Sequence, residues 1–251
     1  MMATAYPFKN LVFEGGGVKG LAYIGVLEIL DTYNILPQIE RVAGTSAGAI
    51  TATLTSFKLN AKEIRDLSNT LDFSKIPQEK SSTDPDWIPG FLDKELDKIL
   101  GDVDSVYRLV KRYGWYASDY FYNWLQETIA SQCKGKGLAT FADFQANGFC
   151  DLHIVVTDVS THSSEVLSVD TAGDVPVADA VRMSMSIPLF FESLQFNGTR
   201  FGSGDYYADG GVLNNYPIHV FDHPQYAKGN SWFLEDTNWE TLGCHLYNQW
   251  C

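Results

Sequence analysis

The chain has 251 residues, of which 45% are hydrophobic and 20% charged, so it can bury one sizeable core, and this composition excludes a disordered or repeat protein. It carries 18 Lys and Arg against 31 Asp and Glu, and the formal net charge of −13 opposes binding to nucleic acid or to an anionic membrane surface. Any contact with lipid must therefore be mainly apolar.

The N-terminus and the cysteines predict a cytosolic, soluble chain. The first ten residues, MMATAYPFKN, lack the basic start and apolar run of a secretory signal, and no stretch approaches the ~18 apolar residues of a membrane span. The cysteines form no CxxC pair and have no histidine at metal-ligand spacing, although Cys244 and His245 are neighbours. We expect four free thiols in a reducing compartment and no metal site. The cysteines are Cys133, Cys150, Cys244 and Cys251.

The first predicted element is a strand over Asn10 to Glu14, NLVFE, which ends at a run of three glycines. From Val18 onward, small or apolar residues recur every three or four positions, which predicts a helix with one face packed inward. The residues of this face are Leu21, Ala22, Gly25, Val26, Ile29 and Leu30.

A second strand is predicted from Ile39 to Ala43, directly before a small, glycine-flanked serine, Ser46. Ile50, Leu54 and Phe57 then follow at helical spacing. This alternation of strand and helix predicts an α/β fold with a parallel sheet.

The middle of the chain differs in character. Residues 77–104 are rich in Asp, Glu, Lys and Pro but contain an apolar cluster at Trp87 to Leu92, which we interpret as part of an insertion over the sheet. The cluster could act as a lid or contact lipid, and the alternative is that it only anchors the insertion to the core. The aromatic stretch from Trp115 to Leu125 predicts a core-facing helix, with a lipid-contact surface as the alternative. Together they define a lid or cap insertion around residues 77–125.

The remaining elements lead to a glycine turn. Leu152 to Val159 and Glu165 to Val169 are predicted strands, and Val177 to Met185 is a predicted helix closed by Pro188. A last strand over Tyr206 to Ala208 runs into Asp209-Gly210-Gly211.

The sequence GTSAG, Gly44 to Gly48, fits the nucleophile-elbow pattern, in which flanking glycines let a strand turn sharply into a helix and expose the central serine. A serine needs an adjacent base to act as a nucleophile. None of the five histidines lies in a motif that marks it as catalytic, whereas Asp209 stands at a strand end before two glycines. Asp209 is therefore a candidate base, and a simple turn aspartate is the alternative.

The glycines at the front of the chain allow two interpretations. Gly15, Gly17 and Gly20 form GxGxxG between a strand and a helix, as in dinucleotide-binding sites. Such a site requires an acidic residue at the end of the second strand, but Glu40 precedes that strand. The same backbone N–H groups at the positive end of a helix could instead hold the oxyanion of a tetrahedral intermediate.

Three motifs resemble those of the patatin-like phospholipase family. They are GGGVKG at residues 15–20, GTSAG at 44–48 and ADGGVLNNYPI at 208–218, in the family's order and spacing, and RMSMSIPLFF at 182–191 is similar to a further family segment. The match extends from about Phe8 to Ile218. This resemblance implies a three-layer α/β/α fold with a mostly parallel central sheet, in a single catalytic domain over residues 1–251.

The resemblance also implies the roles of individual residues. Ser46 would be the nucleophile and Asp209 the base of a two-residue dyad, with Gly44 and Gly48 forming the elbow. The oxyanion hole would consist of backbone N–H groups of the glycine loop, Gly15, Gly16 and Gly17, and of Ala47. Lys19 stands where the family has arginine or lysine and could support the oxyanion or a substrate phosphate, with a packing role as the alternative. No metal or cofactor is implied.

The implied function is that of a lipid acyl hydrolase of the phospholipase A or lysophospholipase type, with an acyl-lipid substrate, transient contact with a membrane surface and no nucleic-acid partner. The alternatives are a soluble carboxylesterase for short acyl esters, which chain-length preference would separate, and a nucleotide-binding protein without enzymatic activity. The chain stops soon after the last motif, so it is expected to be either a compact version or a catalytic segment of a longer protein.

Overall fold

A mixed sheet whose central strands are parallel organises the computed structural model, which describes residues 6–76, 114–227 and 229–247. The strand order is β11-β1-β2-β4-β8-β7, with β5 paired to β4 off this path. The strands are β1 (Asn10–Phe13), β2 (Arg41–Thr45), β4 (Asp151–Asp158), β5 (Ser163–Leu167), β7 (Leu194–Phe196), β8 (Asp205–Asp209) and β11 (Thr241–Cys244). Residues 77–113, which include most of the insertion predicted around 77–125 and its Trp87–Leu92 cluster, lie outside the described residues.

The parallel part of the sheet comprises β11, β1, β2 and β4, whereas β5 and β8 run antiparallel to β4. Smaller pairs of strands are β3 (Gly114–Tyr116) with β6 (Leu189–Phe191), which is parallel, and β9 (Phe233–Leu234) with β10 (Thr237–Asn238), which is antiparallel. The predicted α/β fold with a mostly parallel central sheet is confirmed.

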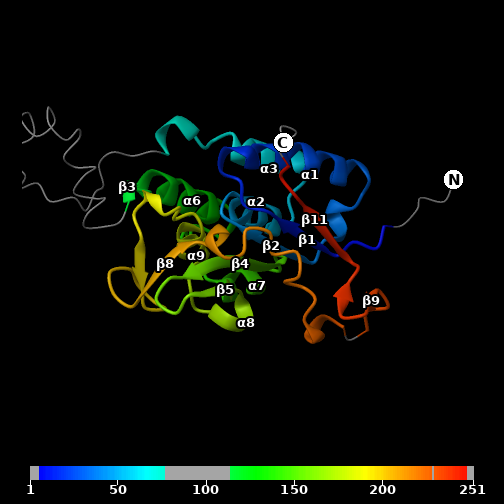
Figure 1. Ribbon diagram of the computed structural model, residues 1–251. Coiled ribbons are helices and arrows are strands. Elements are labelled where there is room, and N and C mark those ends of the chain that lie inside the picture. The colour runs from blue at the N-terminus through cyan, green and yellow to red at the C-terminus, as the bar shows by residue number, and fades with distance from the viewer. Residues whose placement is uncertain (1–5, 77–113, 228, 248–251) are drawn as a thin grey trace, which may run out of the picture.

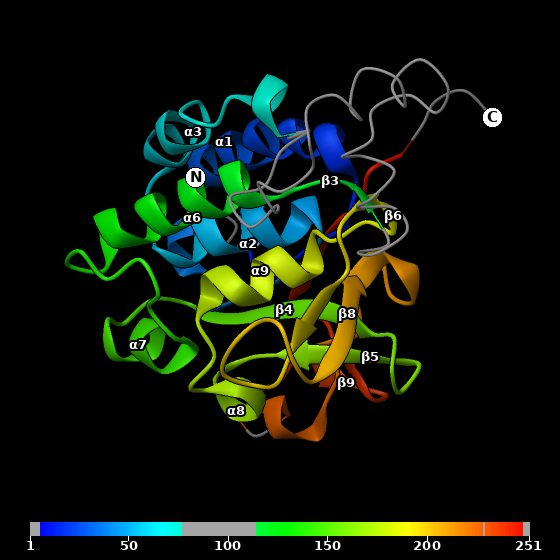
Figure 2. The ribbon, with the colours of Figure 1, turned by 90° about the vertical axis from the view of Figure 1, so that its left-hand side faces the viewer.

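Figures 1 and 2 show α1, α2, α3, α6 and α9 on one side of the sheet, and β9 with the turn before it on the other. The helices are α1 (Tyr23–Thr32), α2 (Ala47–Ser56), α3 (Ala61–Ser68), α6 (Asp119–Gln132), α7 (Phe141–Ala146), α8 (Val169–Ala172) and α9 (Val177–Ser184). Short 3₁₀ helices are η1 (Gly17–Ala22), η2 (Leu36–Gln38), η3 (Phe73–Lys75), η4 (Gly210–Val212) and η5 (Pro224–Tyr226). No helix in the described ranges is both long and apolar enough to cross a membrane.

The strands divide their side chains between two cores, as the two-residue period of a strand requires. Leu11 and Phe13 pack with the helical layer, whereas Val12 and Ala43 pack on the opposite face against Phe221. This second face is covered by the segment around residues 216–226, where the described secondary structure is a 3₁₀ turn rather than long helices.

The predicted inward face of the first helix is wrong at most positions, although Leu30 is buried as expected. Tyr23, Leu27 and Leu30 are buried, whereas Leu21 and Ile29 are exposed. The helix begins as the 3₁₀ segment η1, which has three residues per turn and therefore shifts the phase of the positions that follow. Tyr23 is fixed by its hydroxyl, which donates to the backbone oxygen of Glu14 (2.7 Å).

Two other predictions are confirmed. The aromatic segment forms α6 from Asp119 onward, and its Phe121, Trp124 and Leu125 are buried in the core. The start of the segment is not helical, because Trp115 and Tyr116 belong to β3. The three cysteines in the described residues are free and buried, at positions 133, 150 and 244.

Candidate active site

The sheet register brings Ser46 and Asp209 to one point. Strand β2 runs alongside β4 up to the pair Thr45 and Val155, and β8 runs in the opposite direction along β4 to the pair Asp209 and Val156. The two strands flank β4 on opposite sides and run in opposite directions, so their carboxyl ends reach adjacent residues of β4. This arrangement unites motifs 163 positions apart (209 − 46) in the sequence.

Ser46 occupies a sharp turn between β2 and α2. Its backbone has φ 55° and ψ −124°, a strained conformation for a serine and the one that a nucleophile elbow requires. A Cβ on Gly44 would lie 2.1 Å from the carbonyl oxygen of Gly48, and a Cβ on Gly48 would lie 2.3 Å from that of Phe13. Both flanking glycines are therefore needed for the close packing of strand and helix.

The hydroxyl of Ser184, at the end of α9, holds the backbone of the elbow. It accepts a hydrogen bond from the Ser46 N–H (2.9 Å) and donates one to the Val155 carbonyl (2.6 Å). The Ser46 hydroxyl itself contacts the sulfur of Met185 (3.8 Å). Both residues belong to the segment RMSMSIPLFF, whose small residues were the sole sequence signal of these contacts.

Asp209 ends β8 and is buried. Its Oδ1 accepts a hydrogen bond from the Gly211 N–H (2.7 Å), whereas Oδ2 is buried and has no hydrogen-bond partner among the described residues. Burial raises the pKa of Asp209 to about 6, and interactions with the Ser46 hydroxyl and the Gly211 N–H oppose the rise. The carboxylate thus interacts with the Ser46 hydroxyl, but the two do not form a short hydrogen bond here. In catalytic pairs of this kind, the short bond often forms only when substrate is bound.

The glycine loop lies directly against the serine, since a Cβ on Gly15 would be 3.2 Å from the Ser46 Cβ. The Gly15 N–H donates to the backbone oxygen of Asn215 (2.9 Å), so it is occupied. Gly16 and Gly17 stand at the start of η1, and Ala47 is the first residue of α2, positions whose N–H groups have no acceptor within their own helix. No hydrogen bond engages these three N–H groups within the described residues.

Hydrogen bonds from Asn215 and contacts of Glu14 with residues after β11 support the glycine loop. Asn215 Nδ2 donates to the Glu14 side chain (3.2 Å) and to the Gly15 backbone oxygen (3.1 Å). The Glu14 carboxylate also accepts from the Leu246 N–H (2.6 Å) and pairs with His245 (2.8 Å). Sequence reasoning missed these supports, for which the family motif containing Asn215 was the sole pointer.

The histidines lie in other contacts. His153 is buried against Phe221 and 3.1 Å from Asp151, and His219 pairs with Asp222. Lys19 is exposed on η1, next to the glycine loop. Within the described residues, no group of three or more His, Cys, Asp or Glu side chains is arranged to hold a metal ion.

An apolar cavity of about 310 Å³ opens beside the elbow. Gly17, Ala47 and Met185 line the part next to Ser46, and the rest of the lining is almost entirely hydrophobic. Residues of this lining include Leu21, Ile24, Ile50, Leu54, Leu71 and Trp124. The cavity thus leads from the serine into the helical layer, with a shape and polarity suited to a hydrocarbon chain.

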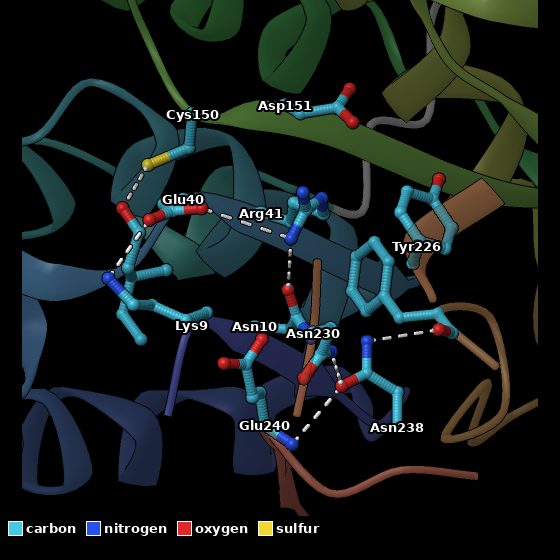
Figure 3. Close-up of polar contacts among 12 residues, drawn as sticks. Lys9, Asn10, Glu40, Arg41, Cys150, Asp151, Tyr226, Asn230, Asn238 and Glu240 are labelled. Atoms are coloured by element: carbon cyan, nitrogen blue, oxygen red, sulfur yellow. Dashed lines mark hydrogen bonds and ion pairs between the residues drawn. The ribbon is translucent and has the colours of Figure 1, made fainter. Parts of the chain in front are cut away.

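Glu40 lies at the amino end of β2, whereas Ser46 and the glycine loop lie at the carboxyl ends of the strands. Glu40 is therefore not placed to bind a nucleotide on the glycine loop. Figure 3 shows it beside Lys9, whose Nζ is 2.9 Å from its carboxylate, and near Arg41. Arg41 in turn donates to the side chain of Asn10 (3.1 Å). These contacts tie the amino ends of β1 and β2 together, a full strand away from Ser46.

Comparisons with known proteins address the family and the fold of the chain. A model of the patatin-like phospholipase family matches residues 11–222. The chain is 36% identical to the uncharacterized protein YqhO of Bacillus subtilis (strain 168) over 84% of this chain and 65% of that protein. It is 21% identical to "Probable lipid hydrolase 463L" of Invertebrate iridescent virus 6, over 97% and 74%. The crystal structure of VipD from Legionella pneumophila resembles it in fold, with a TM-score of 0.55, 24% identity and coverage of 85% of this chain and 47% of VipD.

Proposed function

The chain belongs to the patatin-like phospholipase family, whose members are lipid hydrolases, and we propose that it is a phospholipase A or lysophospholipase that cleaves acyl esters through a Ser46-Asp209 dyad. The observation that carries this proposal is that β2 and β8 end at adjacent residues of β4 from its two sides, where a buried carboxylate of raised pKa interacts with a strained serine. The chain spans 65% of the length of the Bacillus relative, so the activity proposed is that of this catalytic region.

The reaction begins when the Ser46 hydroxyl attacks the ester carbonyl and passes its proton to Asp209. The unpaired Oδ2 is suited to receive this proton, since a base with a pKa of about 6 is ionised at neutral pH and still basic enough to accept. The negative charge that develops on the carbonyl oxygen is stabilised by the N–H groups of Gly16, Gly17 and Ala47. The Gly15 N–H takes no direct part, because it is already bonded to Asn215.

Collapse of this intermediate breaks the ester bond, and the alcohol leaves with the proton returned by Asp209. Water then attacks the acyl-Ser46 ester, gives its proton to Asp209, and releases the fatty acid while Ser46 regains its hydrogen. Backbone dipoles and helix N-termini supply the electrostatic stabilisation. We therefore propose that hydrolysis needs no metal. We also propose a single catalytic domain with an insertion that begins near residue 77 and ends before the core helix α6.

The substrate's acyl chain is assigned to the apolar cavity. Its lining includes Gly17 and Ala47, which supply N–H groups to the proposed oxyanion hole, so a chain lying in it would present its carboxyl end to Ser46. This placement favours a long acyl group over the short, dissolved esters of a carboxylesterase. Lys19, exposed beside the loop, is proposed to support a substrate phosphate, and Lys19→Met should then impair phospholipid more than glyceride hydrolysis.

The decisive experiment measures fatty-acid release from mixed phospholipid vesicles in EDTA by the wild type and by Ser46→Ala. Release by the wild type alone is expected, because loss of the nucleophile should cost several orders of magnitude in turnover. Undiminished release by Ser46→Ala would refute the assignment, and loss of wild-type activity in EDTA would refute metal independence. Esters of increasing chain length then separate the lipid hydrolase from a short-chain carboxylesterase.

A further inference from the structure

An exposed apolar patch surrounds the open side of the cavity. Four of its residues both line the cavity and face solvent, with exposed fractions of 69%, 50%, 36% and 38%, and a fifth stands outside the lining at 63%. We call these five residues the rim patch: Val18, Leu21, Ile187, Phe190 and, outside the lining, Leu189. A rim of this kind is unusual for a surface that contacts water alone.

Leu189 combines two unfavourable features. Its φ is +67°, in the left-handed region that side chains other than those of Gly, Asn and Asp rarely adopt, and its side chain points away from any core. Among the described residues with positive φ, the other non-glycine residues are all polar or charged. Residues with a strained backbone and a side chain unsuited to it cluster at functional sites.

The surrounding structure holds Leu189 outward. The N–H groups of Phe190 and Phe191 both donate to the Ile187 carbonyl, at 3.1 and 2.9 Å, which closes a tight turn around Pro188 and Leu189. The Phe190 ring packs on Tyr116 of β3, 4.9 Å between centroids. An ordered turn that exposes an apolar side chain beside an apolar cavity is suited to insertion into the acyl region of a lipid surface.

The charge of the protein determines which kind of lipid surface the rim patch can bind. Lys19 is the basic residue between Val18 and Leu21 in the chain, Glu192 directly after Phe191 is buried, and the whole chain carries a net charge of −13. Attraction to an anionic bilayer is therefore weak, whereas a zwitterionic surface imposes no such penalty.

We propose that the rim patch docks the protein on the surface of a zwitterionic lipid aggregate, with Leu189 entering the acyl region, so that a lipid chain passes from the aggregate into the cavity without crossing water. The proposal rests on the proposed function for its substrate, but the docking surface is defined by these residues alone. It assigns interfacial contact to Val18, Leu21 and the described turn at 187–190.

The test compares Leu189→Asn with the matched control Leu234→Asn. Asparagine tolerates positive φ, so Leu189→Asn should fold at least as well as the wild type, and thermal unfolding checks this. Leu234 is 54% exposed on β9, far from β3 in both Figures 1 and 2. Both changes are introduced into Ser46→Ala as well, so that binding is measured without turnover.

Flotation with phosphatidylcholine vesicles should show about a tenfold loss of partitioning for Leu189→Asn and none for Leu234→Asn, because one exposed leucine leaves the apolar contact. Unchanged partitioning in Leu189→Asn would overturn the proposal. So would strong binding that requires phosphatidylserine and disappears in high salt, since that would identify an anionic surface. A wild-type dimer that Leu189→Asn converts to monomer, with vesicle binding intact, would assign the patch to a second copy instead.

In the catalytically intact proteins, the ratio of vesicle hydrolysis to hydrolysis of a dissolved short ester should fall about tenfold in Leu189→Asn. An equal fall in both rates would place Leu189 in the chemistry rather than in docking. If the wild type hydrolyses neither substrate, the proposed function fails, while the flotation result still decides whether the patch binds lipid.

Discussion

The buried carboxylate of Asp209 links the proposed catalysis to stability in a way that one substitution can measure. Burial raises its pKa from the ordinary 3.8 to about 6, which corresponds to about 3 kcal/mol between the charged and neutral forms. The folded protein therefore binds this proton more tightly than the unfolded chain does. The resulting stabilisation is present below pH 3.8 and is lost as the pH rises to about 6 and above.

Asp209→Asn removes this titration. Between about pH 4 and about pH 7.5, the difference in free energy of unfolding between variant and wild type should therefore shift by about 2 kcal/mol in favour of the variant. The asparagine amide would replace the buried Oδ2, which has no partner among the described residues, and leaving it unpaired costs stability. This cost is the same at both pH values, so it cancels from the shift.

Urea unfolding followed by circular dichroism at the two pH values measures the shift, and ester hydrolysis by the same protein should be almost abolished. Asp143→Asn is the control, because the Lys136 ammonium lowers the pKa of Asp143 and most of the resulting stabilisation is already present at about pH 4. The difference between that variant and the wild type should therefore change little between the two pH values, and only in favour of the wild type as the pH rises. A difference for Asp209→Asn that stays constant with pH, or that moves toward the wild type as pH rises, would refute a raised pKa at this position.

Four further results are expected. The kcat/KM for a dissolved ester should rise with pH and reach half its plateau near pH 6, the pKa of Asp209, and a half-point near its ordinary value would contradict its role as base. Gly48→Ala should lower the free energy of unfolding by about 3 kcal/mol or more, because its Cβ would lie 2.3 Å from a backbone oxygen, whereas Gly25→Ala, with nothing within 4 Å, should not destabilise in chemical denaturation. Ser184→Ala removes the acceptor for the nucleophile's N–H and should lower kcat about tenfold with little change in KM. Trp124→Ala enlarges the cavity away from the serine and should shift the preference toward longer acyl chains in a competition assay.

The sequence predicted those parts of the molecule whose causes are local. The elbow at Gly44 to Gly48 was visible because a strand that turns directly into a packed helix tolerates no Cβ on either side of the serine. The strands at residues 10–14 and 152–159 were visible as apolar runs, and they form β1 and β4 almost as expected. Short-range sterics and periodicity were sufficient for these features.

Features that depend on distant segments were not predictable in the same way. Ser184 acquires its role from a hydrogen bond across 138 positions, and Asn215 reaches Glu14 across 201. The inward face of α1 was mispredicted because the preceding 3₁₀ turn changes the helical phase, which periodicity counted from Val18 does not detect. Occupation of the Gly15 N–H likewise depends on a backbone oxygen 200 positions away in the chain.

The strained backbone of Ser46 and the buried carboxylate of Asp209 lie at one site because both are attached to strands that pair with β4. The turn at Ser46 and the Asp209 Oδ2, which has no hydrogen-bond partner among the described residues, each cost about 1 to 3 kcal/mol, and neither would persist on a mobile loop. Val155 and Val156 are fully buried and pair with the ends of β2 and β8, and the Val155 carbonyl also anchors the hydroxyl that binds the serine backbone. Loosening this strand should therefore relax the dyad before the fold is lost, so Val155→Ala is expected to reduce kcat at temperatures where circular dichroism still reports a native protein.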